Sequence, residues 1–196
     1  NLDSTDVGSA LAAQDTPATL SLSGAAFRLR MLLHMTTNEL TITSGQSFKL
    51  QFATQGGDNL CDATSSGENY IDVTTSTVIA FNDNSTPADG AALTTNANDP
   101  THGSDAVVNQ TYEESNNFTN SQAVIPVGQD GKWDFSLKDN NTTPTAATYC
   151  LRAVKDTGIL LESYNVIPQI TTSNISQSLT LTITPTTVNL GTLVPQ

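Results

Sequence analysis

The feature that most constrains the fold of this chain is a period of two in its apolar residues. In FRLRMLLHM (27–35), the apolar residues at odd positions alternate with the arginines at positions 28 and 30. In SFKLQFAT (47–54), Phe48, Leu50 and Phe52 alternate with polar residues. This alternation gives a β-strand one apolar and one polar face, and no stretch shows a sustained helical period. Similar patterns or short apolar runs occur at 17–23, 77–81, 132–138, 147–155 and 158–167.

Glycine-containing connections between these stretches predict β-hairpins. Ser44-Gly45 follows ELTIT (39–43), Asp130-Gly131 follows AVIPV (123–127), and Thr157-Gly158 follows LRAVK. Each supplies the residue with positive φ that a tight connection between strands needs. Roughly seven or more strands with this spacing predict an all-β fold, a sandwich or a barrel. We expect an Ig-like antiparallel β-sandwich with extended N- and C-terminal arms.

Changes in composition divide the chain into three parts. The sandwich is expected over 14–172, after an N-terminal arm (1–13). The polar stretch SNISQ (173–177) begins a C-terminal region, 173–196, that consists of a linker and one more strand. Residues 82–106 are rich in Asn, Asp, Pro, Gly and Ser, which predicts a long surface loop within the sandwich.

Cys61 and Cys150 are the only cysteines. Two thiols cannot form a cysteine-rich zinc site, and neither lies in a C-x-x-C pair. We expect a disulfide between them and therefore an oxidising compartment; the alternative is two unpaired core cysteines. The bridge would close a loop of about 90 residues, worth ~4–5 kcal/mol in the chain-entropy model. A chain that begins at Asn1 adds to the expectation of a processed, secreted protein.

The charge balance excludes one class of partner. Seven Lys and Arg residues against 19 Asp and Glu residues give a formal net charge of −12. Such a surface repels the phosphate backbone, so we expect no nucleic-acid partner. No apolar run approaches ~20 residues, so we also expect no transmembrane segment.

The sequence carries no recognisable catalytic constellation. It lacks the G-x-S-x-G and H-E-x-x-H motifs and a phosphate-binding glycine loop. His34 lies in a predicted strand, far in sequence from His102, and is interpreted as a core or edge histidine. Glu113 and Glu114 are neighbours in a strand and would point to opposite faces, so they would not converge on one substrate. We therefore expect a protein that is not an enzyme and holds no cofactor.

Calcium is the one ion that the sequence suggests. Carboxylate and amide oxygens crowd the 82–106 stretch, and hard cations prefer such ligands. The spacing does not match an EF-hand loop, and a solvated acidic loop is the alternative interpretation. The candidate ligands are Asp83, Asn84, Asp89, Asp99 and Asp105.

Asn-x-Ser/Thr triplets, the acceptor sequence for N-glycosylation, are abundant. In a chain this rich in Asn and Thr, several arise by chance. The acceptor residues are Asn84, Asn109, Asn117, Asn140, Asn141 and Asn174.

The C-terminal stretch SLTLTITPTTVNLGTLVPQ (178–196) predicts a strand without a partner strand after it. Three explanations are open: the strand pairs with its own sandwich, it pairs with a neighbouring copy, or it leads into a further domain. Pairing with a neighbour would be donor-strand addition, and its repetition would give an open filament. The N-terminal arm is a less apolar alternative donor. The anchors expected to enter the neighbour's core are Leu179, Leu181, Ile183, Val188, Leu190 and Leu193.

Five runs of the sequence, FRLRMLLHM, FKLQFAT, WDFSLKDN, TYCLRAV and YNVIPQITT, resemble Ig-like β-sandwich modules of large secreted surface proteins from uncultivated bacteria. The resemblance covers most of 14–172 and implies an extracellular structural or adhesive module. Tyr149 immediately precedes Cys150, however, whereas a tyrosine corner would lie two residues before the cysteine. Cys61 follows the 47–54 stretch, so a bridge would join a loop to a strand instead of joining the two sheets as in antibodies.

These observations together predict a structural subunit of an extracellular, pilus-like filament at the cell surface. Its partners would be copies of itself, joined by exchange of a terminal strand. The alternative is a carbohydrate-binding or adhesion module of a larger cell-surface protein. Its site would then lie in the 82–106 loop, with an exposed tyrosine such as Tyr70 or Tyr112.

Overall fold

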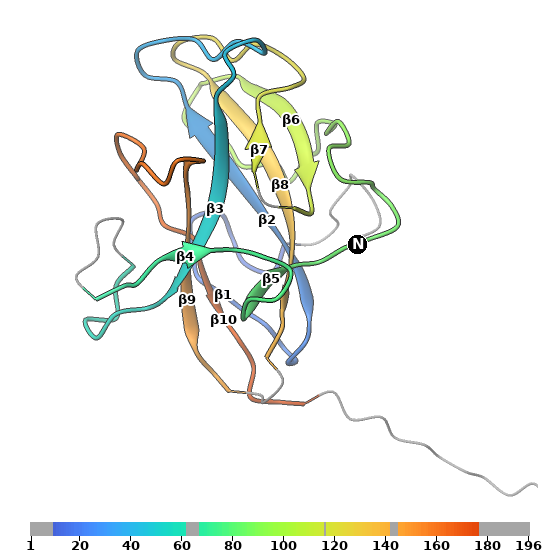
Figure 1. The fold of residues 1–196 in the computed structure, drawn as a ribbon, viewed down its shortest axis with the longest axis vertical. Helices are drawn as coiled ribbons and strands as arrows, with labels where there is room; N and C mark the ends of the chain where they lie inside the picture. Colours follow the sequence, from blue (N-terminus) through green and yellow to red (C-terminus); the bar gives the residue numbers. More distant parts are fainter. Residues whose placement is uncertain (1–9, 62–66, 116, 142–144, 177–196) are drawn as a thin grey trace, which may run out of the picture.

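The computed structural model describes residues 10–61, 67–115, 117–141 and 145–176 (Figure 1). All regular structure in these residues is β, which confirms the predicted all-β sandwich. The alternating stretches at 27–35, 47–54, 132–138 and 147–155 form the four long strands that organise the fold. The strands are β1 (Ala18–Thr19), β2 (Ala26–His34), β3 (Ser47–Thr54), β4 (Ile71–Asp72), β5 (Ile79–Phe81), β6 (Val107–Glu113), β7 (Phe118–Thr119), β8 (Asp130–Asp139), β9 (Thr148–Lys155) and β10 (Gln169–Thr171).

The strands form two sheets that pack face to face. The first sheet has the order β1-β10-β9-β3-β4, with β7 also pairing β3. The second sheet has the order β2-β8-β5, with β6 also pairing β8. Most pairs are antiparallel, as predicted, but β1 runs parallel to β10 and β6 runs parallel to β8. In Figure 1 the long pairs β3–β9 and β2–β8 run along the length of the molecule.

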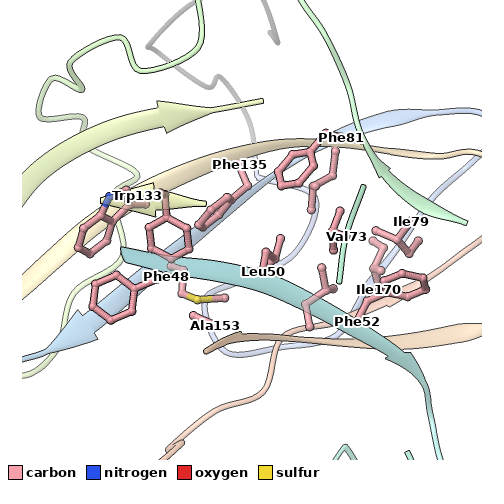
Figure 2. Close-up of a cluster of buried hydrophobic side chains, with 14 of the residues drawn as sticks. Phe48, Leu50, Phe52, Val73, Ile79, Phe81, Trp133, Phe135, Ala153 and Ile170 are labelled. Atoms are coloured by element: carbon pink, nitrogen blue, oxygen red, sulfur yellow. The ribbon is translucent and has the colours of Figure 1, made fainter. Parts of the chain in front are cut away.

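The core lies between the inner faces of the two sheets and is aromatic toward one end. Phe48 of β3 lies near Trp133 and Phe135 of β8 in Figure 2, while Val73, Ile79 and Ile170 gather at the other end. Phe118 of β7 joins the aromatic group, with its ring centroid 4.9 Å from that of Phe135 and 5.3 Å from that of Trp133. Burial of such rings is the main source of stability in a domain of this size.

Two of the predicted hairpins are absent from the described residues. Residues 39–43 contribute only a single bridge, Leu40 to Ile125, because both edges of β3 are already occupied by other strands. Asp130-Gly131 is not a turn but the start of β8; the preceding turn uses Gly128, with φ 74°. The turn at Thr157-Gly158 is confirmed: Gly158 has φ 85° and donates its N–H to the carbonyl of Lys155.

The 82–106 stretch contains no strand, as predicted, and it packs over the outer face of the second sheet. Asn84 donates its side-chain amide to the hydroxyls of Tyr112 and Ser136, and Lys132 donates to the carbonyl of Thr94. Strand β6, which follows this stretch, was not predicted, since VVNQTYE has no clear alternation of apolar and polar residues.

Cys61 and Cys150 form the predicted disulfide, with their Cα atoms 5.6 Å apart. Cys61 lies in the connection after β3, and Cys150 is fully buried in β9. The bridge thus joins a loop to a strand within the first sheet's side of the sandwich, and it links positions with a sequence separation of 89.

Candidate functional site

Strand β2 forms one edge of the second sheet: it pairs with β8, and no other described strand pairs with it. Met35 donates its N–H to the carbonyl of Gln129, and Asp139 donates to the carbonyl of Ala25. In an antiparallel pair the hydrogen-bonded residues alternate, so the odd-numbered residues of β2 direct their backbone groups toward β8. The backbone N–H and C=O of even-numbered residues such as Leu32 therefore point away from β8, along an open strand edge.

A groove of about 1290 Å³ runs beside this edge. We call it the β2 groove; its walls are residues 10–18, β2 with the residues that follow it, and the segment 160–170. Three apolar side chains in these walls are exposed: Leu11 (58%), Leu160 (36%) and Val166 (45%). An open strand edge that borders an apolar groove is suited to accept an extended peptide, because the edge offers hydrogen bonds and the groove offers pockets for alternate side chains.

The predicted donor anchors lie outside the described residues. Leu179, Leu181, Ile183, Val188, Leu190 and Leu193 all belong to 177–196. Of the N-terminal arm, residues 10–13 are described, and they contribute to the β2 groove.

A network of charged groups covers the outer face of β2 and β8. Arg28 and Arg30 of β2 lie 3.7 and 3.4 Å from the carboxylate of Asp134 on β8, which is directly opposite Arg30 and diagonal to Arg28. Asp99, from the 82–106 stretch, binds Lys132 at 2.6 Å and Arg30 at 3.0 Å. Burial raises the pKa of Asp134 to about 6, although the arginines and Lys132 oppose the shift. These pairs fix the 82–106 stretch onto the sheet.

The two adjacent glutamates, Glu113 and Glu114, accept hydrogen bonds from different residues. Glu113 accepts a hydrogen bond from the hydroxyl of Thr111, and burial raises the pKa of Glu113 to about 7. Glu114 accepts hydrogen bonds from the Tyr112 hydroxyl and the N–H of Asn84. Their partners differ, so the two carboxylates do not form a pair around one substrate atom.

Two histidines and two aspartates meet at the end of β2, and we call them the His/Asp cluster. His34 lies directly opposite Asp130 in the register of β2 and β8, in a pair that is not hydrogen-bonded through the backbone, which brings the side chains close. His102 and Asp105 come from the 82–106 stretch, where Asp105 donates its N–H to the carbonyl of His102. The four ligand atoms lie within 4.8 Å of one another.

Sequence reasoning missed this cluster. His34 was interpreted alone as a core or edge histidine, but its ring centroid lies 5.0 Å from that of His102. The sequence signal for this cluster was the short spacing of His102 and Asp105, with Gly103 between them, which favours a turn. In the structure Gly103 has φ 59° and His102 contacts Asp105. His34, His102 and Asp130 also line the β2 groove, so the cluster lies at one end of it.

The predicted calcium ligands do not converge. Asp89 accepts hydrogen bonds from the N–H of Glu114 and the hydroxyl of Ser115, whereas Asp99 pairs with Arg30 and Lys132. Asp105 belongs to the His/Asp cluster, and Asp83 is exposed. The acidic residues of 82–106 therefore engage separate parts of the protein because the outer face of the second sheet supplies cations and hydrogen-bond donors to them.

The glycosylation acceptors differ in exposure. Asn84, Asn109 and Asn141 are half-buried, and Asn84 uses its amide in hydrogen bonds to Tyr112 and Ser136. Asn117, Asn140 and Asn174 are exposed. If the chain is glycosylated, these three are the accessible positions.

Neither of the tyrosines named for a binding site is fully exposed, contrary to the prediction of an exposed tyrosine. Tyr112 is fully buried, because the 82–106 stretch covers it and Arg28 lies 4.6 Å from its ring centroid. Tyr70 is half-buried, with the guanidinium of Arg152 3.7 Å from its ring centroid. Of the two, only Tyr70 therefore has side-chain surface that a ligand could contact.

None of the described residues forms a helix long and apolar enough to cross a membrane. Comparison of the chain with protein-family models, with curated proteins and with solved structures gives no match.

Proposed function

We propose that this protein is a structural subunit of an extracellular, pilus-like filament, in which each copy accepts a terminal strand of its neighbour in the β2 groove. The observation that carries the proposal is the open edge of β2 beside an apolar groove. Such an edge is a template for pairing with another chain, and natural proteins normally cover it.

The C-terminal sequence has the pattern that this groove requires. Leu179, Leu181 and Ile183 alternate with threonines, so an extended strand would place all three on one face. That face would meet the exposed Leu160 and Val166 of the groove wall. The opposite, threonine-bearing face would remain in water.

Two further observations fit an extracellular filament, one about the compartment and one about the geometry of assembly. The disulfide between Cys61 and Cys150 is a feature of proteins that fold in oxidising compartments. Donor and acceptor surfaces are different parts of the chain, so the contact is heterologous and its repetition gives an open filament instead of a closed dimer.

The donor side is tested by a pair of matched double variants. Leu181→Asp with Ile183→Asp places two charges on the apolar face and is expected to give monomers. Thr180→Asp with Thr182→Asp places the same charges on the polar face and is expected to leave filaments intact. Electron microscopy and light scattering measure filament formation by the full chain carrying each double substitution. Normal filaments from the first variant would refute the role of the C-terminal strand.

The acceptor side is tested at Leu32, whose backbone N–H points away from β8. Leu32→Pro removes that N–H without removing a β2–β8 hydrogen bond, and Leu32→Ala shortens the same side chain but keeps the N–H. We expect Leu32→Pro alone to block filaments. Filaments from Leu32→Pro would refute the role of the β2 edge as acceptor. A wild-type chain that stays monomeric and binds glycans saturably would favour the adhesion alternative.

A further inference from the structure

The His/Asp cluster has the composition and spacing of a metal site, and this feature is independent of filament assembly. The Nδ1 atom of His34 lies 3.3 Å from Oδ2 of Asp105 and 3.0 Å from Oδ1 of Asp130. The Nδ1 atom of His102 lies 3.1 and 3.5 Å from the same two oxygens. Both imidazoles therefore direct the same ring nitrogen at the same two carboxylates.

The four nitrogen–oxygen separations are close to the ligand–ligand distances around a small tetrahedral ion. Zinc binds imidazole nitrogen and carboxylate oxygen at ~2.0–2.2 Å, so ligand atoms around a tetrahedral ion lie roughly 3.3 Å apart. The four nitrogen–oxygen separations, from 3.0 to 3.5 Å, lie around that value, and the nitrogen–nitrogen and oxygen–oxygen separations are no more than 4.8 Å.

Hydrogen bonding alone satisfies this arrangement less well. A neutral imidazole has at most one Nδ1–H to donate, yet each Nδ1 faces two carboxylate oxygens. Asp130 is 1% exposed, and its Oδ2 atom has no hydrogen-bond partner within the described part of the chain. A buried carboxylate is costly unless a cation or donors compensate it. An ion between the four ligand atoms would compensate both carboxylates at once.

We propose that the His/Asp cluster binds one divalent transition-metal ion of the zinc class. Two imidazole nitrogens and two carboxylate oxygens favour such an ion over Ca²⁺ and Mg²⁺, which prefer oxygen ligands in larger number. The ion joins the last residue of β2, the first residue of β8 and the 102–105 turn. It therefore fixes one end of the open strand edge and holds the 82–106 stretch against the sheet.

The test is titration of the metal-free full chain with Zn²⁺ against a competing chelator, together with Co²⁺ as a spectroscopic probe. We expect one Zn²⁺ per chain, a higher unfolding temperature with Zn²⁺, and the intense visible absorption of tetrahedral Co²⁺. His102→Asn and Asp105→Asn each remove a ligand from a surface turn and should weaken Zn²⁺ binding by at least ~100-fold, more than loss of an outer-shell partner costs. Asp83→Asn, an exposed carboxylate of the same stretch, is the matched control and should bind as the wild type does.

Three results would overturn the proposal: no saturable Zn²⁺ binding, tighter binding of Ca²⁺ than of Zn²⁺, or wild-type affinity in both ligand variants. Unfolding of each variant in chelator shows whether it still folds. If a variant does not fold, the Co²⁺ spectrum of the wild type decides, because a six-coordinate spectrum would contradict the tetrahedral site.

Discussion

Gly131 lies against the indole of Trp133, so that a Cβ atom at position 131 would come 2.7 Å from Cζ3 of Trp133. Such an atom would come closer still to the side chain of Ile125. Both neighbours are fully buried and cannot move into solvent. We predict that Gly131→Ala lowers the free energy of unfolding by about 1–3 kcal/mol, as overpacking does. Gly57→Ala, where no atom lies within 4 Å of the added carbon, is the control in urea denaturation. Equal stability of the two variants would contradict the packing described.

Asp99 and Lys132 are predicted to be energetically coupled. Lys132 is 1% exposed, and Asp99→Ala would leave its ammonium buried without that carboxylate, at a cost of about 3 kcal/mol. Lys132→Met in the same chain removes the buried charge, so the double variant should cost less than the sum of the single variants. The more exposed pair Lys49–Asp72 provides the comparison, and Asp72→Ala should cost less than Asp99→Ala does. Additive losses in the Asp99–Lys132 cycle, measured by urea denaturation, would show that the pair is not coupled.

From the raised pKa of the buried Glu113 carboxyl, we predict that this group's contribution to the free energy of unfolding declines as pH rises. Burial raises the pKa of the folded carboxyl from 4.5 to about 7, so between these values the folded chain holds a proton that the unfolded chain releases. The contribution of Glu113 to stability is therefore greatest below pH 4.5 and is lost as pH rises through 7, by up to about 3 kcal/mol. Asp134, with its pKa raised to about 6, acts in the same direction at lower pH.

Glu113→Gln tests this assignment, because the amide oxygen still accepts the hydrogen bond of Thr111. Urea denaturation from pH 4 to pH 8 should show a smaller decline for the variant than for the wild type, and greater stability of the variant at pH 8. Glu39→Gln, at an exposed position, removes one negative charge as a control and should keep the wild-type decline. An unchanged slope in Glu113→Gln would contradict the assignment.

The disulfide is predicted to contribute about 2–5 kcal/mol to the stability of the sandwich, because it links cysteines with a sequence separation of 89. Cys61→Ala with Cys150→Ala should lower the urea midpoint by a corresponding amount. A reductant should lower the midpoint of the wild type and leave that of the double variant unchanged. A wild-type midpoint that does not respond to complete reduction would mean that the bridge contributes little.

The sequence predicted the parts of this fold in which local pattern and tertiary packing agree. Strands β2, β3, β8 and β9 follow the alternation of their apolar residues, and the pairing of the only two cysteines follows from their number. The hairpin expected around Ser44-Gly45 failed because tertiary pairing overrode a local turn signal: β9, β4 and β7 already occupy the edges of β3.

The candidate sites were harder to predict, since they depend on contacts between distant segments. The His/Asp cluster needs the register that places His34 opposite Asp130, and it needs the 102–105 turn to pack over that pair. The open edge of β2 is a property of sheet order, which alternation alone does not determine. Of the proposed contact between neighbouring copies, only the donor strand can be predicted from the sequence, by its apolar residues at 179, 181 and 183.

The most direct test of the assembly is to locate the C-terminal strand by photo-crosslinking. A benzophenone amino acid at position 182 is placed in the full chain, and ¹⁵N-labelled and unlabelled chains are refolded together from denaturant and then irradiated. Mass spectrometry identifies the crosslinked peptides and their isotope pairing. Position 182 lies on the threonine-bearing face, so we predict mixed-isotope crosslinks from it to the adjacent strand β2 of the neighbouring chain. Crosslinks confined to peptides of the same isotope content would show that each chain folds its tail onto itself, and would contradict strand exchange between neighbours.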